Sequence, residues 1–160
     1  MNGFILVNKE SGVTSNSIVQ QIKKKIKAKK VGHLGTLDPL ASGLLILAVN
    51  RATKFSSYFL ESDKTYDVQF ELGTSTDTED STGNIIYQSN KLPNKSEVKK
   101  VIDNFVGDSM QIPPFFSALK HKGKPLYEYA RKGEFIKKPS RRITINSIKT
   151  VSYTHLTLPT

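Results

Sequence analysis

The sequence predicts an α+β fold, with a mixed, mainly antiparallel sheet flanked by helices. Short apolar runs bounded by turn residues, which are typical of strands, occur along the chain. Stretches whose apolar residues recur every three or four positions, which are typical of helices, lie between some of them. The two kinds of element follow no regular strand–helix–strand repeat, and this favours an antiparallel sheet. With 160 residues, the chain is long enough to bury a hydrophobic core.

The first three elements are predicted to be a strand, a helix and a second strand. The run GFILV (3–7) indicates a buried strand, and Thr14 or Ser15 can cap the helix that follows. The second strand is LLILAV (44–49), which is apolar enough to lie at the centre of a sheet and too short to cross a membrane. The buried face of the helix is formed by Ile18, Val19, Ile22 and Ile26.

Lysines occupy the rest of the second half of this helix and the residues just beyond it. Cations near a helix C-terminus interact favourably with the helix dipole, so capping and solvation alone explain this surface. The net charge of +10 equally favours contact with the phosphates of a nucleic acid. Both interpretations stay open for Lys23, Lys24, Lys25, Lys27, Lys29 and Lys30.

A helix and a strand are predicted to follow the central strand. Residues 52–62 carry apolar side chains at helical spacing. In residues 64–73 apolar and polar residues alternate, which predicts a half-buried strand with Tyr66 on its inward face.

The next three segments are predicted to be a loop, a strand and a helix. Residues 74–83 are polar and acidic and indicate a loop, from which the chain returns as a strand over 84–89. Residues 96–107 have the spacing of a helix, with Ser96 as its cap and Gly107 as its end.

The last part of the chain is predicted to contain a tight turn, a short helix and a strand. Residues 113–124 lead into a strand and turn, and the helix begins at a proline. The final strand is predicted over 141–151. We expect residues 1–151 to form one domain and 152–160, which has no charged residue, to be a tail foreign to it.

Composition limits the classes of function. A pI near 9.7 favours polyanions, with nucleic acid first and anionic membranes second. The chain has no cysteine and only three scattered histidines, so disulfides and thiolate or histidine metal sites are not expected. No run is long enough to span a membrane, and the N-terminus lacks the pattern of a secretory signal. We therefore expect a cytoplasmic protein without a thiolate or histidine metal site.

One carboxylate, Asp38, stands in a loop rich in glycine just before the central strand. Taken alone, the loop has three interpretations. Asp38 could cap a turn that Pro39 and the glycines shape. Glycine amides could bind a phosphate, although the spacing of a P-loop is missing. Asp38 could also be a catalytic carboxylate, held by a loop that a buried strand supports.

The loop resembles the catalytic motif of a known family. GHLGTLDPLASGLLIL (32–47) is similar to the GH-G-LDP-A-G-L motif of the bacterial tRNA pseudouridine-55 synthases of the TruB type. Four further segments resemble motifs of the family in the same order: NKESGVTS (8–15), ATKF (52–55), KTYDVQFELGTSTDTEDSTG (64–83) and QIPPFFSALKHKGKPLYEYARKG (111–133). The resemblance covers about residues 3 to 150, and several ordered motifs are far more specific than one glycine-rich loop.

The resemblance implies a fold, an activity and a partner. The fold is that of the pseudouridine synthases, and the enzyme is an isomerase that converts the T-loop uridine of tRNA into pseudouridine without cofactor or metal. Asp38 matches the catalytic aspartate, which could act as a nucleophile on the ribose or base, or as a base at the sugar. His33 matches the histidine that occupies the stack when the uridine flips out; a hydrogen-bonded structural histidine is the alternative. Tyr66 matches the tyrosine that stacks on the target base and is assigned to deprotonation at C5.

Other residues in the matching segments are expected to bind RNA or to support the site. Lys64 shares the face of Tyr66 and would favour a phosphate or a carboxylate, although a surface lysine is equally compatible with the pattern. The acidic loop with Asp77, Glu79 and Asp80 looks like a metal site by composition, but a solvated loop that caps its own turns is favoured. The remaining candidates are Lys9, Gly35, Ser117, Lys120, Tyr127 and Arg131.

The chain departs from the family pattern in two places. Glu10 stands where the family usually has proline, and this should loosen one turn. Residues 152–160 do not match the GTYIR-type segment whose arginine pairs with the catalytic aspartate. We therefore expect a truncated catalytic domain, which acts as a monomer on the T-stem-loop of tRNA or, if impaired, serves only as an RNA-binding module. A guide-RNA type synthase and a DNA-binding repressor are less favoured, the latter because no helix-turn-helix pattern is visible.

Overall fold

The computed structural model describes residues 1–153 and divides the chain into two compact units, Met1–Val68 and a second that begins at Gln69. Helices and antiparallel strands occur in both units, which confirms the α+β class. The prediction that residues 1–151 form one catalytic domain stays a prediction. The tail predicted at 152–160 falls almost wholly on residues outside the described part.

A three-stranded antiparallel sheet with the order β1-β3-β2 forms the centre of the first unit. β1 (Gly3–Lys9) and β3 (Gly43–Val49) confirm the two predicted strands. β3 lies in the middle because its side chains are apolar on both faces, and Leu45, Leu47 and Ala48 are almost fully buried. β2 (Val31–His33) was not predicted and pairs with the far half of β3.

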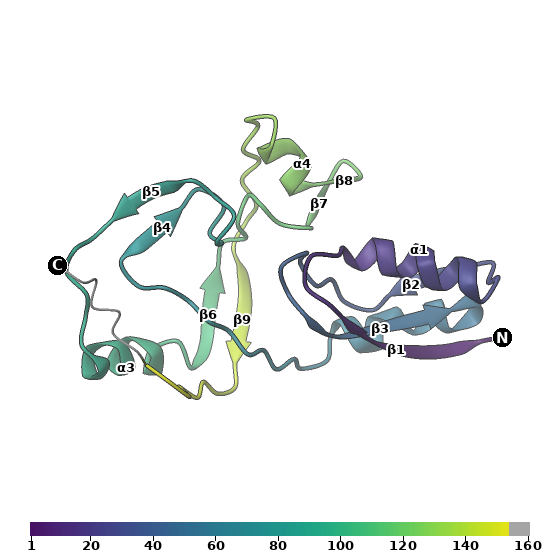
Figure 1. The fold of residues 1–160 in the computed structure, drawn as a ribbon, viewed down its shortest axis with the longest axis horizontal. Coiled ribbons are helices and arrows are strands. Elements are labelled where there is room, and N and C mark those ends of the chain that lie inside the picture. The colour runs from purple at the N-terminus through teal and green to yellow at the C-terminus, as the bar shows by residue number, and fades with distance from the viewer. Residues whose placement is uncertain (154–160) are drawn as a thin grey trace. The chain divides into compact units, whose positions relative to one another are not determined.

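The helix α1 (Ser15–Lys25) packs on one face of this sheet (Figure 1). Thr14 is its N-cap, since the threonine hydroxyl accepts a hydrogen bond from the amide of Ser17 at 3.1 Å. Val19 packs with Leu45 and Leu47 to form one of two clusters of buried residues. Lysines fill the last turn, which completes the predicted amphipathic helix.

The other face of the sheet is covered by the helix predicted over residues 52–62. It begins as a 3-10 turn, η1 (Asn50–Phe55), and continues as α2 (Ser56–Leu60). Ala52 of η1 is buried with Leu34 and Ala48, and Phe59 of α2 packs against them. The central strand is therefore enclosed by a helix on each face, which keeps the loops at its two ends in fixed positions.

The strand predicted over residues 64–73 is absent, and this prediction was wrong. Residues 63–71 have no regular structure, and Tyr66, Val68 and Phe70 are each more than 60% exposed. A strand requires a neighbour that satisfies its backbone N–H and C=O groups, and no strand of residues 1–153 pairs with this segment. The alternating pattern lies instead in the connection between the two units.

The second unit begins with a hairpin of β4 (Thr74–Thr76) and β5 (Ile85–Gln88). β5 confirms a predicted strand, but β4 takes three residues that were assigned to the acidic loop. Within the loop, Asp80 accepts hydrogen bonds from Thr78 and Thr82, and Asp77 accepts two from Asn84. The prediction that the acidic loop caps its own turns is confirmed.

These contacts make the stability of the hairpin dependent on pH. The hydroxyl of Thr82, which donates to Asp80, is the main cause that holds the pKa of this carboxyl below its usual value, and Thr78 adds to the effect against a desolvation that raises it. Stability from Asp80 is therefore complete above about pH 4 and is lost as the pH falls through the lowered pKa. Because Asp80 is exposed, we expect only a few tenths of a kcal/mol. Denaturant titrations of the parent and Asp80→Asn between neutral pH and pH 3 measure it, and parallel pH profiles would contradict it.

The helix α3 (Lys95–Asp103) is capped by Asn94. The prediction that Ser96 is the cap was wrong. The Asn94 side chain accepts from the amides of Ser96 and Glu97, and the Glu97 carboxylate accepts from the amide of Asn94 at 2.8 Å. The helix ends at Asp103, and not at Gly107 as predicted. Gly107 is the first residue of the next strand and has a φ of +102°. The inward face predicted for this helix is only half-buried: Val101 and Phe105 are each 56% exposed.

This cap supplies a sharp test of the helix boundary. We expect Asn94→Ala to lower the free energy of unfolding by about 1 kcal/mol, because two amides of the first turn lose their acceptor. Ser96→Ala is the matched control and should cost less, since its hydroxyl only donates to the Asn94 side chain. Urea denaturation followed by circular dichroism measures both, and a larger loss for Ser96→Ala would contradict the assignment.

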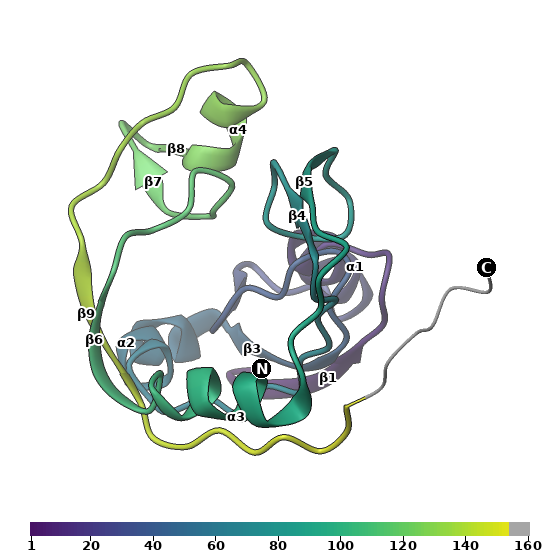
Figure 2. The same cartoon turned by 90° about the vertical axis from the view of Figure 1, so that its left-hand side faces the viewer.

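Two further strand pairs and a short helix complete the second unit. β6 (Gly107–Gln111) and β9 (Arg141–Ile145) run side by side and antiparallel in Figure 1 and Figure 2. β6 was not predicted, and β9 fills only the first half of the predicted last strand. The predicted turn and helix are confirmed: β7 (Lys120–His121) and β8 (Lys124–Pro125) form a small hairpin, and α4 (Leu126–Ala130) follows Pro125.

Candidate active site

Asp38 lies in the loop between β2 and β3, at the end of the sheet where β3 begins. Its residue is exposed, and its carbonyl accepts from the amide of Ala41 at 3.0 Å, which closes a turn around Pro39. Within residues 1–153 the Asp38 carboxylate has no hydrogen bond and no salt bridge. The side chain is thus free to meet a ligand, and the capping role considered for it falls instead to its backbone.

The residue before Asp38 is fixed by a buried serine at the start of α1. The hydroxyl of Ser15 donates to the carbonyl of Leu37 at 2.8 Å and accepts from the amide of Leu37 at 3.0 Å. The Leu37 side chain packs against the cluster around Leu47. Ser15 was predicted only as a possible helix cap. In the structure Thr14 is the cap, and Ser15 holds the loop at Leu37.

The residue after Asp38 is held by a fully buried lysine. Lys9 has no exposed surface, and its ammonium donates to the carbonyls of Val13 at 2.8 Å, Glu10 at 3.1 Å and Pro39 at 3.4 Å. A buried charge is costly unless it is well solvated, and three carbonyl dipoles supply that solvation here. Lys9 therefore joins the segment after β1 to the loop that carries Asp38.

Two backbone contacts strengthen the same connection. The amide of Gly12 donates to the carbonyl of Pro39 at 2.7 Å, and the hydroxyl of Ser11 donates to the carbonyl of Leu40 at 2.8 Å. Gly12 has a φ of +89°, a conformation that residues with a side chain rarely adopt. The backbone on both sides of Asp38 is thus tied to residues 9–15, which is the kind of support that a precisely placed reactive group requires.

His33 is the last residue of β2 and lies on the same face of the sheet as its partner Leu47. The imidazole is half-buried, and its Nδ1 atom is buried without a protein hydrogen-bond partner among the described residues. A buried polar atom without a partner costs about 1–3 kcal/mol. Both interpretations of His33, a residue that occupies the vacated stack and a structural histidine, stay predictions. Gly35, two residues later, leaves open space at the position of a Cβ atom.

Tyr66 and Lys64 lie in the segment that connects the two units, and no contact joins either of them to Asp38. The Tyr66 side chain is 69% exposed. The ammonium of Lys64 donates to the carbonyls of Phe59 at 2.9 Å and Leu60 at 2.8 Å, which caps the C-terminal end of α2. Their roles toward RNA stay predictions.

The other predicted site residues lie in the second unit. Lys120 is exposed in β7, and its carbonyl accepts from Lys138 at 3.1 Å. The guanidinium of Arg131 lies 5.2 Å from the centre of the Tyr127 ring, a cation–π contact at the end of α4. The hydroxyl of Ser117 is buried with no protein partner among the described residues, and its carbonyl accepts from the amide of Tyr127 at 3.1 Å.

Two other features, a metal site and a membrane-spanning helix, are absent from the described part of the chain. No group of three or more acidic, histidine or cysteine side chains within residues 1–153 is arranged to hold a metal ion. No helix there is long and apolar enough to cross a membrane. The candidate active site is therefore the Asp38 loop with the residues that support it.

The sequence model of the family described as "TruB family pseudouridylate synthase (N terminal domain)" matches residues 23–159. The chain belongs to the TruB family. This match includes the Asp38 loop and most of the described structure, so the fold class and the resemblance found in the sequence are both confirmed.

Curated TruB relatives show how much of such a protein this chain represents. The tRNA pseudouridine synthase B of Azoarcus sp. (strain BH72) is 44% identical over 96% of this chain and 51% of its own length. The protein of the same name from Vibrio campbellii (strain ATCC BAA-1116) is 47% identical over 92% of this chain and 47% of its own. The chain thus spans about half the length of these relatives.

Solved structures are also similar to this TruB chain. A chain of "Crystal Structure of a Cbf5-Nop10-Gar1 Complex" matches 75% of this chain and 31% of its own length, at 27% identity and a TM-score of 0.49.

Proposed function

We propose that this chain carries the catalytic loop of a tRNA pseudouridine synthase and that Asp38 is its catalytic residue. The observation that carries the proposal is the loop itself: an exposed carboxylate without a protein partner in the described residues, whose neighbours Leu37 and Pro39 are held by hydrogen bonds from Ser15 and Lys9. The relatives that cover nearly the whole chain are named for this activity.

The chemistry of the proposed reaction suits one unpaired carboxylate. Uridine becomes pseudouridine when the N1–C1′ bond breaks, the base turns, a C5–C1′ bond forms and the C5 proton leaves, while N1 gains a proton. The reaction is an isomerisation and consumes no other reactant. A carboxylate can serve as a nucleophile or as a base at the sugar, and either role requires that it lie within reach of the target nucleotide.

The target is the T-loop uridine (U55) of tRNA, which must leave its stack to reach Asp38. His33 lies next to the loop, and its Nδ1 atom has no partner within residues 1–153, which is compatible with a histidine that meets RNA when the uridine flips out. Tyr66 would stack on the base and take part in deprotonation at C5. Lys9 supports the loop, whereas Gly35, Lys64, Lys120 and Arg131 would contact RNA. We expect a cytoplasmic monomer that needs no metal or cofactor.

The experiment that tests this function is carbodiimide mapping of pseudouridine in unmodified tRNA. We expect a new reverse-transcription stop at the T-loop uridine after incubation with the chain, together with release of tritium from C5-labelled uridine. A tRNA with cytidine at that position is the matched control, because it keeps the shape of the substrate and removes the reacting base.

A negative result in this experiment would favour the alternative function, that of an RNA-binding module. Binding of tRNA without a stop and without tritium release would mean that the chain acts only as an RNA-binding module. The net charge of +10 is the observation that favours this alternative.

A further inference from the structure

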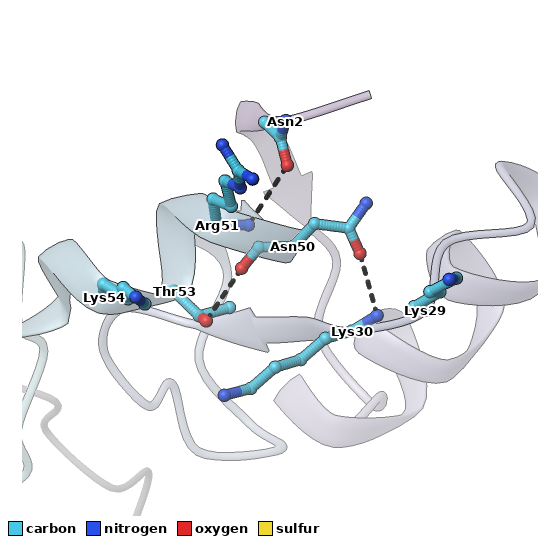
Figure 3. Close-up of a pocket in the computed structure, with 7 residues that line it drawn as sticks. All are labelled: Asn2, Lys29, Lys30, Asn50, Arg51, Thr53 and Lys54. Atoms are coloured by element: carbon cyan, nitrogen blue, oxygen red, sulfur yellow. Dashed lines mark hydrogen bonds between the residues drawn. The ribbon is translucent and has the colours of Figure 1, made fainter.

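A shallow hollow of about 440 Å³ lies at the end of the sheet opposite Asp38 (Figure 3). It is bordered by the N-terminal end of β1, the residues before β2 and the first turn of η1. β3 runs from the Asp38 loop to this hollow. Its seven residues separate the two places by about 20 Å, since a strand rises about 3.3 Å per residue.

Asn50 builds the hollow by joining three segments of the chain. Its side-chain oxygen accepts from the amide of Lys30 at 3.0 Å, and its own amide donates to the Lys30 carbonyl at 2.8 Å. Its side-chain nitrogen donates to the carbonyl of Met1 at 2.7 Å. Asn50 adopts a φ of +53°, a left-handed conformation that asparagine tolerates better than most residues. The arrangement is therefore built from specific contacts, unlike a set of lysines that share a helix face.

Two more contacts fix the first turn of η1 at this place. The amide of Arg51 donates to the side-chain oxygen of Asn2 at 3.2 Å. The hydroxyl of Thr53 donates to the carbonyl of Asn50 at 2.9 Å. The backbone that carries the cationic side chains is thus held, while their ends stay free to meet a ligand.

Four cationic side chains and no acidic one line the hollow: Lys29, Lys30, Arg51 and Lys54. All four residues are exposed, and within residues 1–153 none of their charged groups forms a hydrogen bond or salt bridge. Like charges gathered around one hollow repel one another and raise the local concentration of anions. The other lining residues are polar, so no apolar side chain is present that would enter a lipid interface.

We infer that this hollow binds backbone phosphates of an RNA stem while a nucleotide of the same RNA reaches the Asp38 loop. The inference rests on the proposed function for its partner and adds a second RNA-binding site at the other end of the sheet. Duplex RNA is recognised mainly through shape and phosphates, which a cluster of lysine and arginine without base-reading groups can serve. Lys29 and Lys30 belong to this site. The sequence alone was compatible with two roles for them, helix capping and phosphate contact.

The test compares two variants that remove the same charge. Arg51→Gln/Lys54→Gln removes two cations of the hollow and keeps the side chains near their original length. Lys99→Gln/Lys100→Gln removes two from the exposed face of α3. Lys29→Gln/Lys30→Gln serves as a second hollow variant. Affinity for the unmodified T-stem-loop is measured at several salt concentrations, with thermal melts of every variant.

The hollow variants are expected to weaken RNA binding about fivefold per cation removed at low salt. They should also lower the slope of log affinity against log salt by about 2, because two counterions fewer are released on binding. The α3 control should change neither value as much. Equal losses in all variants, or no loss in either hollow variant, would overturn the inference.

Pseudouridine mapping on the same samples separates this inference from the proposed function. If the parent forms pseudouridine but the hollow variants bind RNA like the parent, only the inference fails. If the parent binds RNA through the hollow but forms no pseudouridine, only the function fails. Inorganic phosphate or phosphatidylserine vesicles that bind through the hollow while RNA does not would replace the RNA by another anion and overturn the inference.

Discussion

Asp38→Asn is expected to abolish pseudouridine formation and to leave RNA binding unchanged. The carboxylate lies at the tip of a fixed loop without a protein partner in the described residues, so its loss removes a reactive group and no structural contact. An amide is neither a competent nucleophile nor a base at neutral pH, and loss of such a group lowers turnover by a thousandfold or more, to order of magnitude. Tritium release under single-turnover conditions measures the rate, and filter binding measures the affinity.

The matched control for this prediction is Asp103→Asn. Asp103 is an exposed aspartate at the end of α3, so the change has the same chemistry outside the loop. We expect this variant to keep the rate of the parent. Turnover by Asp38→Asn near the parent rate would falsify the catalytic role of this residue, and a fall in its thermal stability would show that the carboxylate has a structural partner.

The fold could be predicted where local pattern and tertiary environment agree. β3 is apolar on both faces and could only be a buried central strand, and α1 has both a capping threonine and a clear apolar face. β2 has three residues, one of them glycine, and gains its structure from pairing with β3. The alternation over residues 64–73 is as clear as in any strand, but no strand within residues 1–153 pairs with it. An alternating pattern shows that a segment could have one apolar and one polar face, but it does not show that another strand is present to pair with it.

The reactive residue of the site could be predicted from the sequence, but the residues that hold its loop in place could not. Asp38 follows from the motif, whereas the burial of Lys9 could not be expected, because lysine is among the residues least often buried. Lys9 was predicted to support the site or to contact RNA, and its burial favours support. Ser15 looked like a helix cap because serine is typical at that position, and only the structure shows that its hydroxyl faces Leu37.

The role of Lys9 leads to the second large effect. Lys9→Met keeps the length and the apolar part of the side chain but removes the donor shared by the carbonyls of Glu10, Val13 and Pro39. Each buried carbonyl without a donor costs about 1–3 kcal/mol, and relief from burying a charge offsets part of this. We expect the free energy of unfolding to fall by about 2 kcal/mol, measured by urea denaturation.

Catalysis should suffer more than binding in this variant. The Pro39 carbonyl keeps the Gly12 amide, so the loop is loosened and not lost. A displacement of about 1 Å can lower a rate about a hundredfold, and we expect the turnover of Lys9→Met to fall roughly tenfold to a hundredfold. The affinity for tRNA should stay within about twofold, because the ammonium is buried and an exposed charge would be needed to act on a phosphate.

Lys24→Met is the matched control, since Lys24 is exposed on α1 and loses the same charge. It should keep the stability and the turnover of the parent and lose only a little affinity at low salt. If Lys9→Met were as stable and as fast as the parent but bound tRNA much more weakly, the lysine would act on RNA directly. Its burial would then have to be relieved when RNA binds. Loss of turnover at unchanged affinity, together with lower stability, is the result that a positioning residue produces and an RNA contact does not.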